Sequence, residues 1–186
     1  MEKNTTRFIV ITGLMAAIAV VLGATHWGFI PWFGGVSLTI MHIPAIIAAV
    51  LVGPLSGALV GLVFGIFSMI QAAIAPTGPT DVWFTNPMLA ILPRLFIGPA
   101  AWLAASALKR WPAVSLAAAG VAGSLTNTTL VLGTIGFLGY LPWVVLGGIA
   151  VANGLPEMAA SGLITAVVIA AYRQMPFGKK QGADLD

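Results

Sequence analysis

Long apolar runs dominate the chain, and short stretches of Gly, Pro or charged residues separate them. A helix needs roughly 20 apolar residues to cross a hydrocarbon core of about 30 Å. Six runs approach this length, so the pattern predicts an all-α protein, an integral membrane bundle of six transmembrane helices that forms one domain over residues 1–186. The predicted spans cover residues 7–25, 36–53, 54–75, 87–108, 113–136 and 148–172.

Composition supports lipid as the main solvent and excludes several classes of function. Hydrophobic residues make up 59% of the chain and charged residues 7%, too few charges for a soluble domain of this length. The chain has no cysteine, and its two histidines are far apart, so the sequence predicts no metal site. It also lacks paired carboxylates, a nucleophile with a nearby base, and a phosphate-binding glycine loop before a lysine. We therefore expect no enzymatic activity, no cofactor and no nucleic acid.

Basic residues gather on one side of the predicted spans. They precede the first span, follow the fourth and follow the sixth, whereas the other connections, 26–35, 76–86 and 137–147, contain no Lys or Arg. Because cytoplasmic loops carry an excess of Lys and Arg, both termini are predicted to be cytoplasmic. The basic residues on this side are Lys3, Arg7, Lys109, Arg110, Arg173, Lys179 and Lys180.

Three polar residues are predicted to lie deep within separate spans. At 1.5 Å per residue, Arg94 and Glu157 lie about 12–13 Å from the outer ends of their helices, and Asn127 reaches nearly the same depth. Ionisable groups within a span usually face the bundle interior, a partner group or a water-filled cavity. Under aromatic outer loops, such a layer is typical of a small-molecule site. The alternative is a buried ion pair between Arg94 and Glu157, with the aromatics forming an ordinary interfacial belt.

Small residues form two helical faces. Gly57, Gly61 and Gly65 follow one another at intervals of four in the third span, which predicts tight packing inside the bundle. The first span carries a second set, which suits either the docking of a partner helix or packing within the bundle. This candidate docking face comprises Gly13, Ala16, Ala17, Ala19 and Gly23.

Two sequence segments carry a family resemblance. TIMHIPAIIAAVLVGPLSGALVGLVFG runs from Thr39 to Gly65, and FTNPMLAILPRLFIG runs from Phe84 to Gly98. With six spans and an alanine-rich first helix, they resemble the S components of energy-coupling factor (ECF) transporters, most closely the pantothenate-type branch. The resemblance implies a multi-pass subunit of a prokaryotic plasma membrane that binds a vitamin with high affinity from outside. It also implies docking on a transmembrane coupling protein and two ATPase subunits.

With a vitamin as the expected ligand, we hypothesise a role for each residue of the polar layer. Arg94 would pair with the carboxylate of a ligand such as pantothenate, and Asn127 and Asn153 would bind its amide and hydroxyl groups. Trp83 and Trp32 would cover the ligand. The full set of candidate substrate-binding residues is Arg94, Asn127, Thr128, Asn153, Glu157, His42, Trp83, Asn86 and Trp32.

Three alternatives remain open at this stage. The chain could serve another vitamin, such as cobalamin, riboflavin, folate or pyridoxine. It could be a self-sufficient secondary carrier or channel, which would need an aqueous path or inverted repeats with broken helices. It could also be a membrane scaffold without a ligand, whose thermal unfolding no vitamin would shift.

Overall fold

Helices form most of the chain in the computed structural model, which describes residues 2–31, 37–76, 78 and 80–174. Within these described residues, five helical stretches are long and apolar enough to cross a membrane. They coincide with five of the six predicted spans, which confirms the prediction of a helical membrane bundle to that extent. The stretches are α1 (Glu2–Ala24), α3 (Pro54–Ile74), α4 (Pro87–Ala90) with α5 (Leu92–Ala107), α6 (Pro112–Phe137), and α7 (Trp143–Ile149) with η3 (Ala150–Gly154) and α8 (Leu155–Gln174).

The second predicted span, 36–53, is wrong as a single helix. Strand β2 (Ser37–Thr39) occupies its beginning and pairs antiparallel with β1 (Phe29–Pro31). Only α2 (Ile43–Val52) is helical, and its 10 residues cover about 15 Å, half of a hydrocarbon core. The helix cannot begin much earlier because Pro44 occupies its first turn, where a missing backbone N–H is tolerated.

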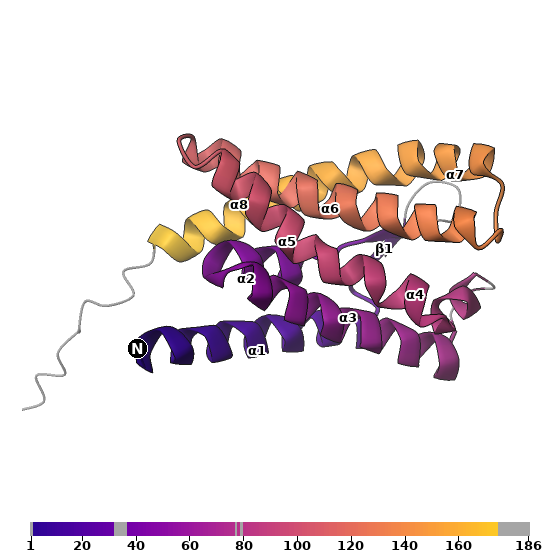
Figure 1. The fold of residues 1–186 in the computed structure, drawn as a ribbon, viewed down its shortest axis with the longest axis horizontal. Coiled ribbons are helices and arrows are strands. Elements are labelled where there is room, and N and C mark those ends of the chain that lie inside the picture. The colour runs from indigo at the N-terminus through magenta and orange to yellow at the C-terminus, as the bar shows by residue number, and fades with distance from the viewer. Residues whose placement is uncertain (1, 32–36, 77, 79, 175–186) are drawn as a thin grey trace, which may run out of the picture.

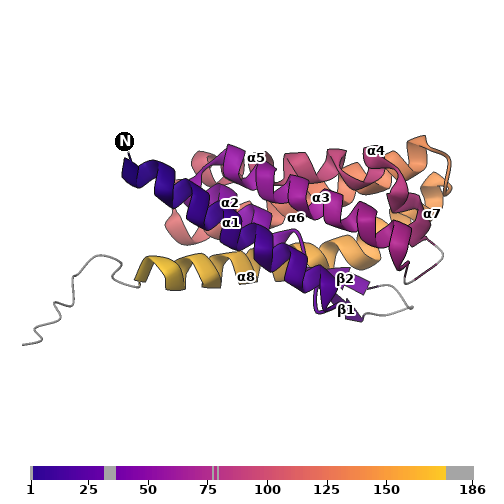
Figure 2. The same cartoon turned by 90° about the horizontal axis from the view of Figure 1, so that it is seen from below.

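The two ends of the bundle differ in what they carry. Helix α1 begins and α8 ends at the same end, where the connection between α5 and α6 also lies (Figure 1). The β1–β2 hairpin lies toward the opposite end (Figure 2). At the first end Arg7 donates a hydrogen bond of 3.0 Å from Nη2 to the carbonyl of Leu51, near the C-terminus of α2, where helical carbonyls lack backbone partners. That this end faces the cytoplasm stays a prediction from the positive-inside rule.

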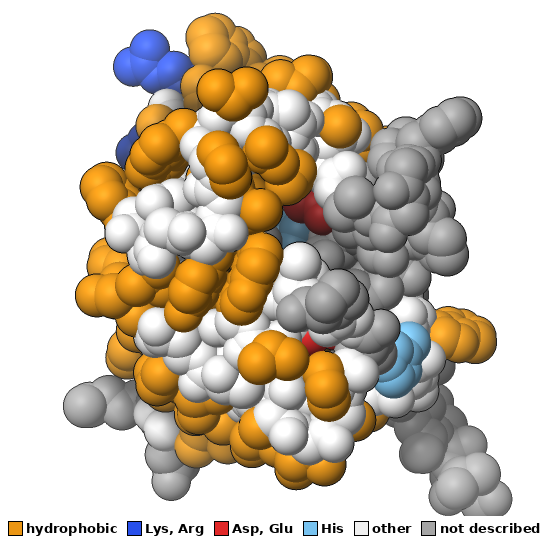
Figure 3. Space-filling view, turned by 90° about the vertical axis from the view of Figure 1, so that its right-hand side faces the viewer, with side chains coloured by type: hydrophobic (Ala, Val, Ile, Leu, Met, Phe, Trp, Pro, Cys, Tyr) orange, Lys and Arg blue, Asp and Glu red, His pale blue; other side chains and the backbone are white. Residues whose placement is uncertain are grey.

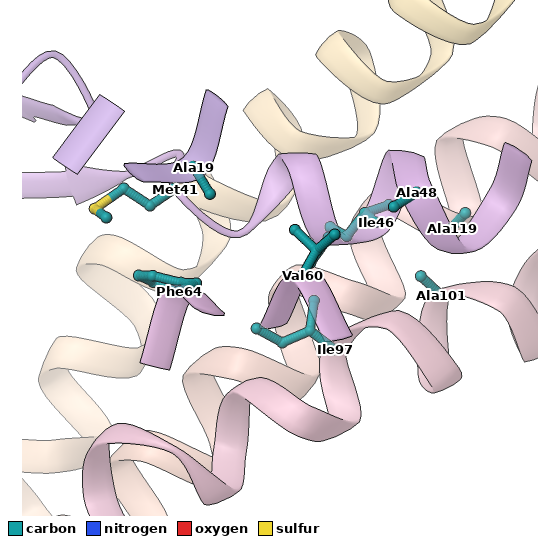
Figure 4. Packing of buried hydrophobic residues seen from close by; sticks show 10 residues of the cluster. Ala19, Met41, Ile46, Ala48, Val60, Phe64, Ile97, Ala101 and Ala119 are labelled. Carbon is teal, nitrogen blue, oxygen red and sulfur yellow. The ribbon is translucent and has the colours of Figure 1, made fainter. Parts of the chain in front are cut away.

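Helix α2 forms the centre of the bundle. Its residues from Ile43 to Ala49 are all buried, and Ile46 belongs to an apolar cluster that α1, α2, α3, α5 and α6 build together (Figure 4). The polypeptide just before α2 is also enclosed, since Met41 and His42 are at most 1% exposed. Non-helical backbone at membrane depth is tolerated only where protein or a cavity surrounds it. The break before α2 therefore places polar backbone groups inside the bundle, where protein shields them from lipid.

The glycine stripe of α3 packs against α4 and α5, as the sequence predicts. A side chain at Gly61 would overlap the backbone carbonyl of Arg94, and a Cβ at Gly65 would come within 2.7 Å of the Ala90 carbonyl oxygen. At Gly57 a Cβ would lie 2.7 Å from the Cα of Gly98. The stripe thus brings the backbone of α3 against the segment that carries Arg94.

Candidate functional site

Arg94 is held inside the bundle as a buried cation. Its residue is 5% exposed, and its guanidinium carbon lies 5.3 Å from the ring centroid of Phe64 on α3. A second ring, that of Phe84 in η2 (Asp81–Thr85), lies 5.0 Å from the same carbon. Contacts with two aromatic faces stabilise a cation and fix the plane of the guanidinium. Arg94 Nε has no hydrogen-bond partner among the described residues.

Pro93 explains why the carbonyl that Arg94 binds is available. The Nη1 group of Arg94 donates to the backbone carbonyl of Leu89, which lies four residues before Pro93. In an uninterrupted helix this carbonyl would accept from the N–H of residue 93, but proline has none. The helix is broken here into α4 and α5, with Ile91 between them. The proline therefore leaves free the acceptor that the arginine uses.

Glu157 connects three elements that are distant in sequence. Its Oε1 accepts a hydrogen bond of 2.6 Å from the backbone N–H of Thr39, the last residue of β2. Its Oε2 lies 3.5 Å from the Thr128 hydroxyl of α6, which donates to it. The carboxylate thus fastens the hairpin to α6 and α8. These contacts give Glu157 a set of partners different from those of Arg94, rather than the ion pair considered from the sequence.

His42 lies directly before α2 and is fully buried. Its Nε2 is 2.8 Å from the hydroxyl of Ser161, one turn beyond Glu157 on α8, whereas its Nδ1 has no partner in the described structure. His42 therefore connects the start of α2 to α8, one turn from Glu157.

Unpaired polar atoms gather in this interior. Buried polar groups are nearly always hydrogen-bonded, so each exception requires a reason. Here the exceptions among the described residues come from the start of α2 and from α5, α6 and α8, the elements that surround the site. A bound ligand or water would supply the missing partners. The atoms are His42 Nδ1, Arg94 Nε, Ser124 Oγ, Asn127 Oδ1 and Thr165 Oγ1.

Asn153 lies in η3, a π-helical turn, and is 8% exposed. Pro156 follows closely and cannot donate to the carbonyl four residues before it, which explains the wider turn. A Cβ on Gly154 would lie 3.3 Å from the Thr128 methyl group, so this turn packs against α6. Single π-helical turns are frequent at functional sites, where they redirect a side chain.

Two predicted site residues have structural contacts, and a third lies outside the described residues. Asn86 caps α4, because its Oδ1 accepts a hydrogen bond of 2.9 Å from the backbone N–H of Met88. Trp83 stacks on Tyr140 with 5.2 Å between ring centroids, and packs against an apolar cluster at this end of the bundle. Trp32 is the one that lies outside the described residues. That Trp83 covers a ligand remains a prediction.

Five buried polar residues escaped the sequence analysis, and three of them lie on α6 and α8 near the predicted site residues: Ser161, Thr165 and Ser124. With Glu157, the first two follow one another at intervals of four along α8, and Ser124 precedes Asn127 by three residues on α6. Both spacings place side chains on one face of a helix. This periodicity was the available signal, because polar residues recur there on the inner face of otherwise apolar helices.

The end of the bundle that carries α7 and η2 has a hollow near its centre. Acidic and histidine side chains are visible inside this hollow, and hydrophobic side chains surround much of its rim (Figure 3). An apolar entrance above a few convergent polar groups is the usual form of a small-molecule site.

Residues 7–169 match a protein family described as ECF transporter, substrate-specific component. The chain belongs to this family. It is 30% identical to the pantothenic acid transporter PanT of Lactococcus lactis subsp. cremoris, over 92% of this chain and 96% of that protein. It is 33% identical to the pantothenate transporter PanT of Leuconostoc mesenteroides, over 53% of this chain and 50% of that protein.

Membership of the ECF family confirms several predictions. The chain is a substrate-specific component of a vitamin uptake system, and its role is transport rather than catalysis. Five apolar helices agree with a multi-pass protein of a bacterial plasma membrane. Its buried polar side chains come from helices of both halves of the chain.

The small residues of α1 lie on two different faces of this S component. Ala19 is completely buried, and a side chain at Gly23 would overlap Phe67 of α3, so both belong to the bundle interior. Ala16 packs partly against the same core. Gly13 and Ala17 are exposed, and no atom lies within 4 Å of a Cβ built on Gly13. Only this second face is open to a partner helix.

Proposed function

We propose that this S component binds pantothenate from the extracellular side and delivers it through an ATP-driven module. That module would comprise a transmembrane coupling protein and two ATPase subunits. The printed names of the two relatives support the choice of vitamin. The absence of a phosphate-binding motif from the sequence supports the need for separate ATPases.

The observation that carries the proposal is the buried Arg94 guanidinium. Its described partners are neutral: a backbone carbonyl and two aromatic rings. A charged group at this depth is costly to bury, and an anionic ligand would offset much of that cost. Pantothenate carries one carboxylate, and charge-assisted hydrogen bonds in a desolvated site are the strong ones. Arg94 Nε is the described donor that remains available for it.

The uncharged part of pantothenate matches the remaining unpaired atoms. The vitamin carries one amide and two hydroxyl groups, which need donors and acceptors once they leave water. Asn127 Oδ1 can accept from a hydroxyl or amide N–H, and His42 Nδ1 can donate or accept according to its tautomer. Asn153, on the π-helical turn, offers a further amide. The polar groups thus suffice for a small hydrophilic acid.

Isothermal titration with two ligands tests the role of Arg94. Pantothenate and its alcohol analogue, which has a hydroxymethyl group in place of the carboxylate, differ only at the group assigned to Arg94. In Arg94→Gln, pantothenate should bind about 3 kcal/mol more weakly, roughly 150-fold in Kd, while the alcohol should change little. Arg110→Gln, at the opposite end of the bundle, is the matched control and should bind both ligands as the wild type does.

Two results would contradict this proposal. If Arg94→Gln weakened the binding of pantothenate and of its alcohol analogue equally, Arg94 would not recognise the carboxylate. If titration against a vitamin panel showed tight binding only of another vitamin, the assignment of pantothenate would be wrong. Transport is tested separately in proteoliposomes: uptake by the purified chain alone would identify a self-sufficient carrier instead of an ATP-dependent subunit.

The exposed face of α1 is the proposed docking surface for the coupling protein. Ala17→Trp places a large side chain on this face, and it should abolish assembly with the module while leaving pantothenate affinity unchanged. Ala24→Trp, also exposed on α1 but at its other end, is the comparison variant. Normal assembly of Ala17→Trp would exclude this face.

A further inference from the structure

A second cavity lies at the end of the bundle remote from the proposed vitamin site. Its volume is about 490 Å³, and its lining comes from the ends of α2, α5 and α8 and from the start of α6. Lys109, just after α5, and Arg173, in the last turn of α8, both line it. These residues follow or end two of the predicted membrane spans, which places the cavity at the membrane surface.

The cavity has positive charge without a balancing negative charge. Its lining includes Lys109 and Arg173 but no Asp or Glu. In the part of the chain that the structure describes, neither basic side chain forms a hydrogen bond or an ion pair. Because the two cations come from different helices, the fold itself brings them to one cavity. An anion that binds there would contact both.

The start of α6 adds to this positive potential. Its first turn contains no acidic residue, and its N-cap residue, Trp111, makes no side-chain hydrogen bond. Pro112 and Ser115, both in that turn, line the cavity. The Ser115 hydroxyl instead donates a hydrogen bond of 2.9 Å to the carbonyl of Ala105. The partial positive charge of a helix N-terminus therefore faces the same space.

The remaining walls suit a lipid better than a free ion. Val50 and Ala105, which pack against the apolar core, form part of the cavity, and Ser106 contributes one hydroxyl. Trp102 also lines it and is 37% exposed, a common position for tryptophan at a membrane interface. Basic pockets between membrane helices on the cytoplasmic side are known to hold anionic lipid headgroups. We propose that this cavity binds the phosphodiester headgroup of an anionic phospholipid through Lys109 and Arg173.

The test uses the purified full-length chain, delipidated in a neutral detergent. Native mass spectrometry measures retention of phosphatidylglycerol and of phosphatidylcholine with the same acyl chains. Phosphatidylglycerol should bind at one site in preference to phosphatidylcholine. Lys109→Gln or Arg173→Gln should each weaken it about fivefold, and the double variant about 25-fold.

Two further variants separate this site from general surface charge. Arg110→Gln removes the adjacent positive charge, which does not line the cavity, and should change lipid affinity less than twofold. Ser106→Leu keeps both cations but narrows the cavity and removes its hydroxyl, and should weaken phosphatidylglycerol binding. Pantothenate affinity should be unchanged in every variant, which shows that the protein is folded and that the two sites are independent.

Several outcomes would overturn the lipid proposal. Equal weakening by Arg110→Gln, or equal binding of phosphatidylcholine, would indicate non-specific attraction. Full displacement of the lipid by glycerol phosphate at the same concentration would identify a site for small soluble phosphates. If the Lys109 and Arg173 variants kept lipid binding but lost assembly with the ATP-driven module, the cavity would be part of a protein interface.

Discussion

Gly61→Ala is the smallest change that should disturb the proposed vitamin site from outside it. The first atoms that the new Cβ would meet are the carbonyl oxygen and carbon of Arg94, both in the backbone. A side chain could rotate away from such a contact, but a helical backbone cannot, so α3 and α5 must separate. Overpacking of this kind costs about 1–3 kcal/mol. We expect about 2 kcal/mol, which lowers Tm by about 4–8 °C for a chain of this length.

The same displacement should weaken pantothenate binding. Arg94 takes its position from the backbone that Gly61 contacts, so its guanidinium should no longer meet the carboxylate in the best geometry. If half of a charge-assisted hydrogen bond is lost, about 1.4 kcal/mol, pantothenate should bind roughly tenfold more weakly. Thermal unfolding in detergent and isothermal titration measure the two effects independently.

Gly133→Ala provides the matched control. Gly133 lies in α6, and a Cβ built on it has no atom within 4 Å, so the same added methyl group should lower neither Tm nor affinity. If Gly61→Ala behaved like Gly133→Ala in both assays, close contact between the α3 and α5 backbones would not position Arg94, and the reasoning would be refuted.

Substitutions at two further positions test individual hydrogen bonds. Glu157→Ala should speed amide exchange at Thr39 by roughly 10- to 150-fold, since a hydrogen bond to a charged acceptor contributes about 1.5–3 kcal/mol. Glu157→Gln keeps an acceptor oxygen and should retain most of the protection, whereas equal exchange in wild type and Glu157→Ala would exclude this contact. Pro93→Ala should return an N–H donor to the Leu89 carbonyl, release Arg94 and weaken pantothenate about fivefold by titration, with about 1 kcal/mol lost. Unchanged affinity would show that this carbonyl does not orient the arginine.

The sequence predicts the helical spans well but not their interruptions. Apolar runs identify five helical stretches because hydrocarbon requires both length and low polarity. Residues 37–39 lead directly into the apolar run of α2, and the alternation of Ser37, Leu38 and Thr39 is too short to separate a strand from a helix. Pro44 was the available signal, since a helix that began at residue 36 would have carried it in the interior.

For the candidate site, the sequence identifies the buried groups but not their partners. Arg94, Asn127 and Glu157 are all buried in the described structure, as their position within apolar spans predicts. The partner of Glu157 is Thr39, 118 residues away along the chain, and no local pattern encodes such a contact. The cap formed by Asn86 was readable, because Asn before a proline at a helix start is a common N-cap arrangement.

Because Pro93 leaves the Leu89 carbonyl free and Arg94 binds it, substitutions at these two positions should be correlated in evolution. Replacing the proline alone would give the acceptor a competing donor, and replacing the arginine alone would strand a carbonyl in apolar surroundings. An S component that evolves to bind an uncharged substrate should therefore replace both residues and regain an uninterrupted helix. Homologues that keep the proline but lack the arginine should be rare, unless another donor has taken over that oxygen.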